Sequence, residues 1–190
     1  MQRYILTGAP GAGKTVLIRG LERAGFAVVE EAATDLIALV TARGVVEHWD
    51  EPSALDDLVA LQRRRQERAD AWPDPVAFYD RSPICTLALC EFMERSPPNS
   101  LLQELARIER DGVFEREVFF VRGLGFITPT EARRINLHDA LRFEAVHEDV
   151  YRRLGYQLVD VPPASVEDRL DLVVRRVTGA GLISPNAATH

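Results

Sequence analysis

The clearest chemical pattern in this sequence lies near the N-terminus, in the segment Gly8-Ala9-Pro10-Gly11-Ala12-Gly13-Lys14-Thr15. Its spacing, G-x-x-x-x-G-K-T, is that of a P-loop, and an apolar segment precedes it while a helical pattern follows. Glycines let backbone N–H groups approach phosphate oxygens, and the following helix presents its positive end to the anion. We therefore expect the residues from Gly8 to Val16 to bind a nucleoside triphosphate. Lys14 should reach the β- and γ-phosphates, and the Thr15 hydroxyl should bind Mg²⁺.

The basic residues of the chain support this interpretation. Lys14 is the only lysine among 23 basic residues, and all the others are arginine. An arginine bias of this kind is typical of genes with a biased codon composition. One lysine nevertheless stands where a P-loop needs a compact ammonium group.

Two charged residues, Asp80 and Arg81, directly follow the apolar segment 76–79. In open α/β sheets, ligands bind beyond the carboxyl ends of the strands. P-loop proteins keep an acid there that organises the magnesium ion, so we expect Asp80 to hold it through a water molecule. Arg81 is a candidate for contact with a phosphate or an acidic substrate. The alternative is a surface ion pair.

The acidic residues after the second predicted strand are candidates for the acceptor side of a phosphoryl transfer. Glu31 or Asp35 could accept the proton of a substrate hydroxyl. Both could equally be acidic residues that favour the N-terminal end of a helix through its dipole.

Arginines form a third group of candidates. Arg133 and its neighbour Arg134 lie between the fourth and fifth predicted strands, where a helical lid of about 128–154 could close them over the transferred phosphoryl group. Nearby acidic residues could instead pair with them. Arg122, at the end of the fourth strand, is a further candidate. The arginines of segment 63–68 are expected on a solvated helix face, and the four histidines show no ligand spacing.

The elements that must position these residues alternate along the chain. Short apolar strands are predicted at 4–7, 26–29, 76–79, 118–121 and 156–161. Helices are predicted at 15–24, 31–43, 53–71, 83–95, 101–109, 130–154 and 166–177. The second helix should bury Leu36, Ile37, Leu39 and Val40. Alternation of this kind predicts parallel βαβ units, and thus one three-layer α/β domain over 1–178 with an irregular tail over 179–190.

Composition disfavours several classes of function. The formal net charge of −6 disfavours a nucleic-acid binder, which usually has a basic surplus. Two cysteines, Cys85 and Cys90, suit a reducing, cytoplasmic setting without a disulfide. We find no signal peptide pattern and no apolar run of the roughly 18 residues that a membrane span needs.

Taken together, the motifs resemble a known family. The runs TGAPGAGKT, VVEEAATDLI, LQRRRQERAD, FYDRSPICTLALC and YRRLGYQLVDVP resemble AAA-type ATPases of the kinase-like P-loop group. That group includes nucleoside and nucleotide kinases and the ribosylnicotinamide-kinase domain of NAD-biosynthesis regulators. The resemblance covers nearly the whole chain.

The resemblance implies a five-stranded parallel sheet in the order 2-3-1-4-5, and it implies binding of ATP and Mg²⁺. Carried over by position, Asp80 is the Walker-B-like acid, Arg81 is its partner, and 162–165 would lie near the base. The chain departs from the family at Thr34, where an arginine is common, and at Cys85, where an acid is common. Segment 121–123 also lacks an expected acid.

Two functions follow as hypotheses. The first is a magnesium-dependent phosphotransferase that uses ATP and acts on a small hydroxylated or phosphorylated metabolite. The alternative, which the departures favour, is a regulatory protein that binds and slowly hydrolyses ATP or GTP without such an acceptor. The sequence leaves the oligomeric state open, a homodimer included.

Overall fold

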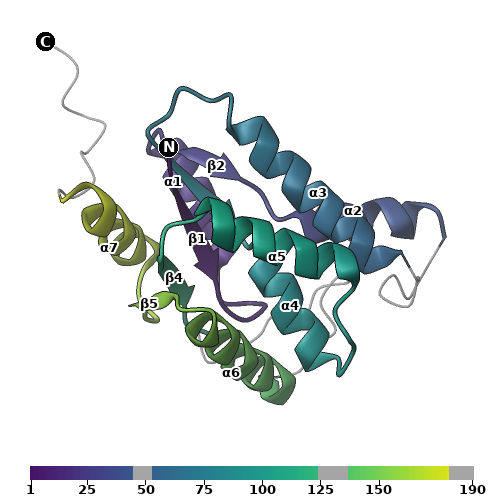
Figure 1. The fold of residues 1–190 in the computed structure, drawn as a ribbon. Coiled ribbons are helices and arrows are strands. Elements are labelled where there is room, and N and C mark those ends of the chain that lie inside the picture. Colours follow the sequence, from purple (N-terminus) through teal and green to yellow (C-terminus); the bar gives the residue numbers. More distant parts are fainter. Residues whose placement is uncertain (45–52, 124–136, 180–190) are drawn as a thin grey trace, which may run out of the picture.

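The computed structural model describes residues 1–44, 53–123 and 137–179. Figure 1 shows the strands at the centre with helices around them. The strands are β1 (Gln2–Thr7), β2 (Ala27–Val29), β3 (Val76–Asp80), β4 (Glu117–Val121) and β5 (Gln157–Val161). The helices are α1 (Lys14–Arg23), α2 (Ala32–Ala42), α3 (Ala54–Ala69), α4 (Pro83–Phe92), α5 (Asn99–Asp111), α6 (Leu137–Arg153) and α7 (Val166–Thr178).

The five strands form one parallel sheet in the order β2-β3-β1-β4-β5. This confirms the predicted fold class and strand order. The register pairs Leu6 of β1 with Asp80 of β3. Because the chain continues from β1 into the glycine-rich segment, Asp80 lies next to that segment at the carboxyl edge of the sheet.

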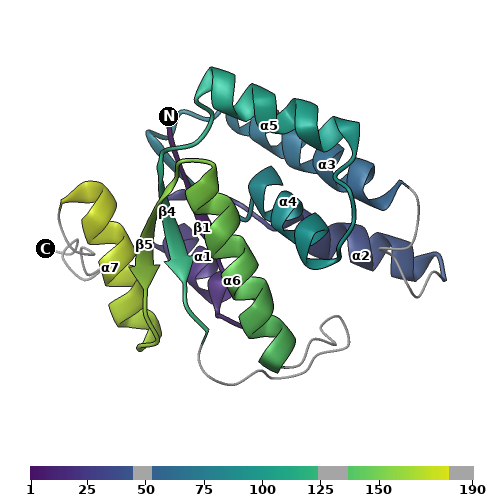
Figure 2. The same cartoon turned by 60° about the horizontal axis from the view of Figure 1, so that its bottom comes forward.

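Alternate side chains of the strands enter two separate cores, as a sheet covered on both faces requires. Tyr4 and Leu6 pack with Phe78 under α1 and α7. Ile5 and Tyr79 pack on the opposite face, in the core that also contains residues of α4, α5 and α6. Figure 2 shows α7 on one side of β4 and β5 and α6 on the other. These are the three layers that the sequence predicts.

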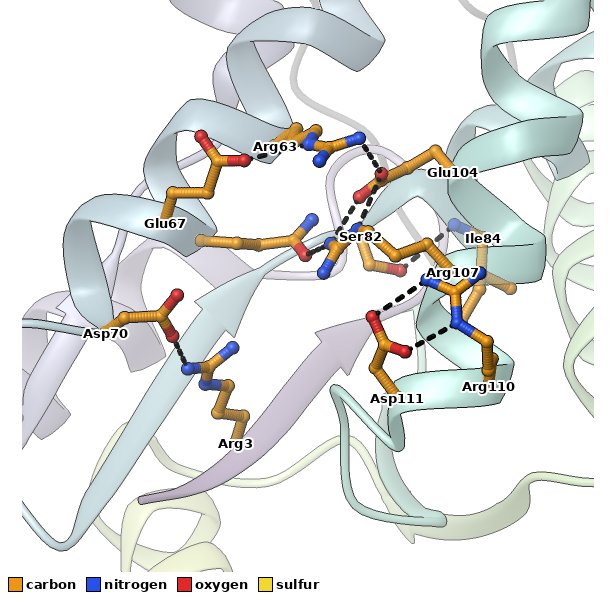
Figure 3. A network of polar contacts seen from close by, with 11 residues as sticks. Arg3, Arg63, Glu67, Asp70, Ser82, Ile84, Glu104, Arg107, Arg110 and Asp111 are labelled. Carbon is orange, nitrogen blue, oxygen red and sulfur yellow. Dashed lines mark hydrogen bonds and ion pairs between the residues drawn. The ribbon is translucent and has the colours of Figure 1, made fainter.

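The start of α4 fixes the junction that follows β3. Ser82 is its N-cap, and the Ser82 side chain accepts a hydrogen bond from the backbone N–H of Ile84 at 3.2 Å (Figure 3). Pro83 occupies the first turn, where a missing N–H costs little. The junction therefore holds Asp80 and Arg81 between a central strand and a capped helix.

A buried acid joins the two outer helices α3 and α5. Glu104 is 2% exposed, accepts two hydrogen bonds from Arg107, and lies 3.7 Å from an Arg63 nitrogen (Figure 3). Arg107 also donates to Gln66 of α3 at 2.5 Å. These contacts fix α3, which supplies part of the cavity wall described below.

One burial prediction is wrong. Leu39 of α2 is 51% exposed, and Leu36, Ile37 and Val40 are only partly buried. In the described chain, α2 packs mainly against α3 rather than against the sheet, so few of its apolar positions have a partner. No helix in the described ranges is long and apolar enough to cross a membrane.

Candidate functional site

The glycine-rich segment turns tightly between β1 and α1. Gly8, Gly11 and Gly13 all have positive φ angles, which residues with a side chain rarely adopt. A Cβ atom at Gly8 would lie 2.2 Å from the carbonyl oxygen of Val121, so only glycine fits there. The segment forms the predicted loop between a strand and a helix.

Lys14 is the buried cation of this loop. Its side chain donates to the carbonyl oxygens of Gly8 at 2.9 Å and Ala9 at 2.7 Å. Burial lowers the pKa of Lys14 to about 7, with nearby Arg81 adding to the effect. Asp80 and Glu31 partly offset these effects, and a bound triphosphate would add anionic oxygens beside the ammonium group.

Thr15 and Asp80 form a pair of oxygen donors. The Thr15 hydroxyl lies 3.4 Å from Oδ2 of Asp80, while Oδ1 of Asp80 is buried without a hydrogen-bond partner. Burial, assisted by Glu31, raises the pKa of Asp80. Hydroxyl and carboxylate oxygens are ligands that Mg²⁺ prefers, usually with waters and phosphates. The orphaned oxygen therefore fits a hydrated magnesium ion at this position.

Arg81 has a strained backbone and a charged partner. Its φ angle is 73°, in the left-handed region, and its N–H donates to Leu6 at 3.1 Å. Its Nε lies 2.5 Å from Oε1 of Glu31. Burial raises the pKa of Glu31, but Arg81 and Lys14 outweigh it, so the pKa lies below its usual value. Glu31 is therefore ionised at neutral pH and can accept a proton.

A cavity of about 180 Å³ lies next to this ion pair. Its wall includes Pro10 of the loop, Glu31 and Arg81. The other lining residues are mostly apolar or uncharged: Ala33, Thr34, Ile37, Leu58, Gln62, Cys85, Thr86, Leu89 and Phe143. A small molecule in this cavity would contact Glu31 on one side and lie beside the glycine-rich loop.

Asp35 lies elsewhere. Its side chain is 56% exposed and pairs with Arg65 of α3, and it is absent from the cavity wall. The structure thus separates the two acids that the sequence left equivalent. Arg65 also donates to the carbonyl oxygen of Glu30 at 2.7 Å, so it does not belong to a fully solvated arginine face.

Arg133 and Arg134 lie outside the described residues, and the lid stays a prediction. The described helix α6, which the predicted lid range includes from 137 on, buries Val150 and Tyr151 completely. This part of the range is packed against α4 and β5.

Sequence reasoning missed two residues of α6. His147, one of the four histidines without ligand spacing, is fully buried, and its Nε2 lies 3.3 Å from Nη1 of Arg81. One turn later, the Tyr151 hydroxyl lies 2.9 Å from Oγ of Ser82 and 3.2 Å from Sγ of Cys85. His147 and Tyr151 are four residues apart and share helical spacing with apolar Phe143 and Val150. This pattern in the sequence indicates that both lie on the buried face of the helix.

Arg169 is a third residue that the sequence did not single out. It is 4% exposed and donates to the carbonyl oxygens of Ala12 at 3.0 Å and Arg122 at 3.2 Å. Arg169 thus connects the glycine-rich loop to the end of β4.

Arg122 pairs with three carboxylates and lies over the Phe120 ring. The carboxylates are those of Glu144, Glu148 and Asp160. Its role in the described chain is therefore to join β4, β5 and α6.

The comparison with protein families gives a match over most of the chain. The family described as an AAA domain matches residues 3–169, so the chain belongs to this family. Together with the loop geometry, this makes the chain a P-loop nucleotide-binding domain. The search of curated proteins gives no match.

Several solved structures, among them two kinases, share the fold. A deoxyadenosine kinase from M. mycoides, with products dCMP and dCDP bound, has a TM-score of 0.63 at 11% identity and covers 94% of this chain and 100% of its own. NadR protein in complex with NAD and AMP-PNP has a TM-score of 0.68 at 16% identity, over 96% of this chain and 51% of NadR. Thymidylate kinase from Ehrlichia chaffeensis has a TM-score of 0.62 at 13% identity, over 93% and 98%. The chain therefore has the fold of kinase-like P-loop proteins.

Proposed function

We propose that this chain is a magnesium-dependent phosphotransferase that moves the γ-phosphoryl group of ATP to the hydroxyl of a small acceptor. The observation that carries the proposal is the position of Glu31, an ionised carboxylate on the wall of a cavity beside the P-loop. A general base must come within hydrogen-bond reach of the hydroxyl it deprotonates. Glu31 meets this requirement for an acceptor in the cavity, whereas exposed Asp35 does not.

The wall of the cavity favours an acceptor that carries no phosphate. Arg81 is the single cation among the described residues that line it, and Glu31 already pairs with it. Phosphate groups are usually bound by several charge-assisted hydrogen bonds. The neighbours named deoxyadenosine kinase and NadR, the latter also solved in complex with NR, support nucleoside-like acceptors as the first class to test.

The proposed reaction uses residues of the P-loop and residues of the cavity beside it. The P-loop amides and Lys14 bind the triphosphate, and Glu31 takes the proton of the acceptor hydroxyl as its oxygen attacks the γ-phosphorus. The bond to the β–γ bridging oxygen breaks, and ADP leaves with the bonding electrons. Mg²⁺, when held by Thr15 and a water on Asp80, would neutralise charge on the β- and γ-phosphates. Arg81 would stabilise charge on the transferred group, as would Arg133 in the predicted lid.

A cytoplasmic setting is part of this proposal. Cys85 and Cys90 are both free thiols and both are buried. Such thiols suit a reducing compartment, where ATP and its acceptors are also available.

The test is an acceptor-stimulated release of ADP, measured first with a panel of nucleosides and then with other hydroxylated metabolites. Lys14→Ala and Asp80→Asn should abolish the stimulation. Glu31→Gln should lower kcat by about a hundredfold or more while ATP still binds, because general-base catalysis contributes about 10²–10⁴-fold.

Glu30→Gln is the matched control. Glu30 neighbours Glu31, but its side chain is about half exposed and pairs with Arg19, so its loss should leave kcat unchanged. If Asp35→Asn lowers kcat and Glu31→Gln does not, the base has been assigned to the wrong acid. If no acceptor stimulates ADP release while ATP binds tightly, the regulatory alternative takes the place of the kinase.

A further inference from the structure

The Arg81 guanidinium has an ion-pair partner on one side and a hydrogen-bond partner on the other. Glu31, at the start of α2, contacts Nε at 2.5 Å, and His147 of α6 contacts Nη1 at 3.3 Å. The two partners come from elements more than a hundred residues apart in the sequence. A guanidinium held by the Glu31 ion pair alone could pivot about that contact, whereas a hydrogen bond from another nitrogen fixes its plane.

The hydrogen bonds of His147 determine which ring nitrogen carries the proton. Nδ1 lies 2.9 Å from the carbonyl oxygen of Phe143, which can only accept, so the hydrogen must be on Nδ1. The neutral ring then has a lone pair on Nε2, and this lone pair accepts from Arg81. The Phe143 ring packs edge-on against the imidazole, with the centroids 4.3 Å apart, and fixes its orientation further.

The next turn of α6 holds the same junction by a separate contact. Tyr151 bonds to Ser82 and Cys85, and Cys85 in turn lies 3.2 Å from the Thr7 hydroxyl. Both His147 and Tyr151 are fully buried. Of these two residues, His147 is the one that contacts the guanidinium, so the two roles can be separated by mutation.

We propose that His147 is a positioning residue that aims the Arg81 guanidinium at the transferred phosphoryl group. This inference rests on the proposed function, because it assigns a task to Arg81 in phosphoryl transfer. His147 touches neither acceptor nor nucleotide in the proposal and acts through Arg81. It belongs to α6, which lies within the predicted lid range, and it extends the site beyond the P-loop, β3 and α2.

The kinetic test compares His147→Phe, His147→Gln and Tyr151→Phe. Phenylalanine keeps a ring against Phe143 but has no acceptor, and glutamine can place its amide oxygen near the position of Nε2. His147→Phe should lower kcat by about tenfold to a hundredfold with KM for ATP little changed, since misplacement of about 1 Å can cost a hundredfold. His147→Gln should recover part of kcat, and Tyr151→Phe should retain it.

A double mutant tests whether the effect passes through Arg81. In an Arg81→Lys background, His147→Phe should have little further effect on kcat, because the contact it removes is already lost. Independent, additive losses would overturn the proposal. So would equal losses in His147→Phe and Tyr151→Phe, because they would indicate a common structural role of α6.

A readout without catalysis separates this inference from the proposed function. In ¹⁵N NMR of the histidine side chains, with the His147 signals assigned by their absence in His147→Phe, wild-type His147 should be the Nδ1–H tautomer at pH 7. Arg81→Lys should change the Nε2 shift. If no acceptor is phosphorylated but these shifts are observed, the proposed function fails while the contact stands. An Nε2–H tautomer, or shifts that do not respond to Arg81→Lys, would contradict the positioning role directly.

Discussion

Burial of Lys14 disfavours its charged form, and a bound nucleotide would stabilise that form. Its side chain is almost fully buried and bonded only to carbonyl oxygens in the described contacts, with Arg81 nearby. The pKa of Lys14 is lowered because burial removes water from the charged form. Triphosphate oxygens would reverse the balance by placing negative charge against the ammonium group.

We therefore predict proton uptake when Mg·ATP binds at pH 8. At this pH, a group with a pKa of about 7 is mostly neutral in the free protein, and it becomes charged in the complex. Calorimetric titration in buffers of different ionisation enthalpy should show uptake of up to about one proton per nucleotide. At pH 6 the uptake from Lys14 should fall to about a tenth of a proton, since both states are then mostly protonated. Uptake of the same size at both pH values would argue against this origin.

At the scale of elements, the loop between β1 and α1 depends on close approach to the end of β4. We predict that Gly8→Ala lowers the free energy of unfolding by at least about 2 kcal/mol and weakens ATP binding, because its Cβ would overlap the Val121 carbonyl oxygen. Gly25→Ala is the matched control, with a φ angle of 91° but open space around the added carbon. It should cost about 1 kcal/mol from backbone strain alone. Urea denaturation measures the free energy of unfolding of both variants. An equal loss of stability in the two would show that the overlap at Gly8 is relieved by a small shift of the backbone.

Helix α6 should make stability depend on pH through His147. Burial, together with the charge of Arg81, lowers the pKa of His147 well below 6.5, with Lys14 adding to the effect and the Phe143 carbonyl opposing it. The unfolded chain therefore binds this proton more readily, so the contribution of neutral His147 is complete above about pH 6.5 and is lost as the pH falls. The stability difference between wild type and His147→Phe should shrink from pH 7 to pH 5 in urea unfolding. A constant difference would contradict the assigned burial.

The elements themselves could be predicted from the sequence because each rule involved is local. Apolar runs indicated the strands, Gly8 to Thr15 indicated a loop before a helix, and the strand order came with the family resemblance. The choice between Glu31 and Asp35 could not be predicted, because both lie within one helical turn and only tertiary packing turns Glu31 toward the cavity. His147 was missed for a similar reason, since its partner Arg81 is distant in the sequence.

At the scale of the whole molecule, a nucleotide that binds the folded chain alone should raise its stability. At a ligand concentration of about a hundred times Kd, the gain is about 2.7 kcal/mol, which corresponds to about 5–10 °C in Tm for a domain of this size. Differential scanning fluorimetry with Mg·ATP should show this shift. Lys14→Ala should lose most of it, and an unchanged shift in that variant would undermine the assignment of the P-loop.

The solitary lysine has a further consequence for how this chain can be studied. Apart from the N-terminus, the sequence offers a single primary amine, and that amine lies in the phosphate-binding loop with its basicity suppressed. A neutral amine is a nucleophile, so small electrophiles that react with amines should modify the chain near neutral pH at one internal position. Bound triphosphate would shield that position, and the extent of labelling would then report occupancy of the loop without any enzymatic assay.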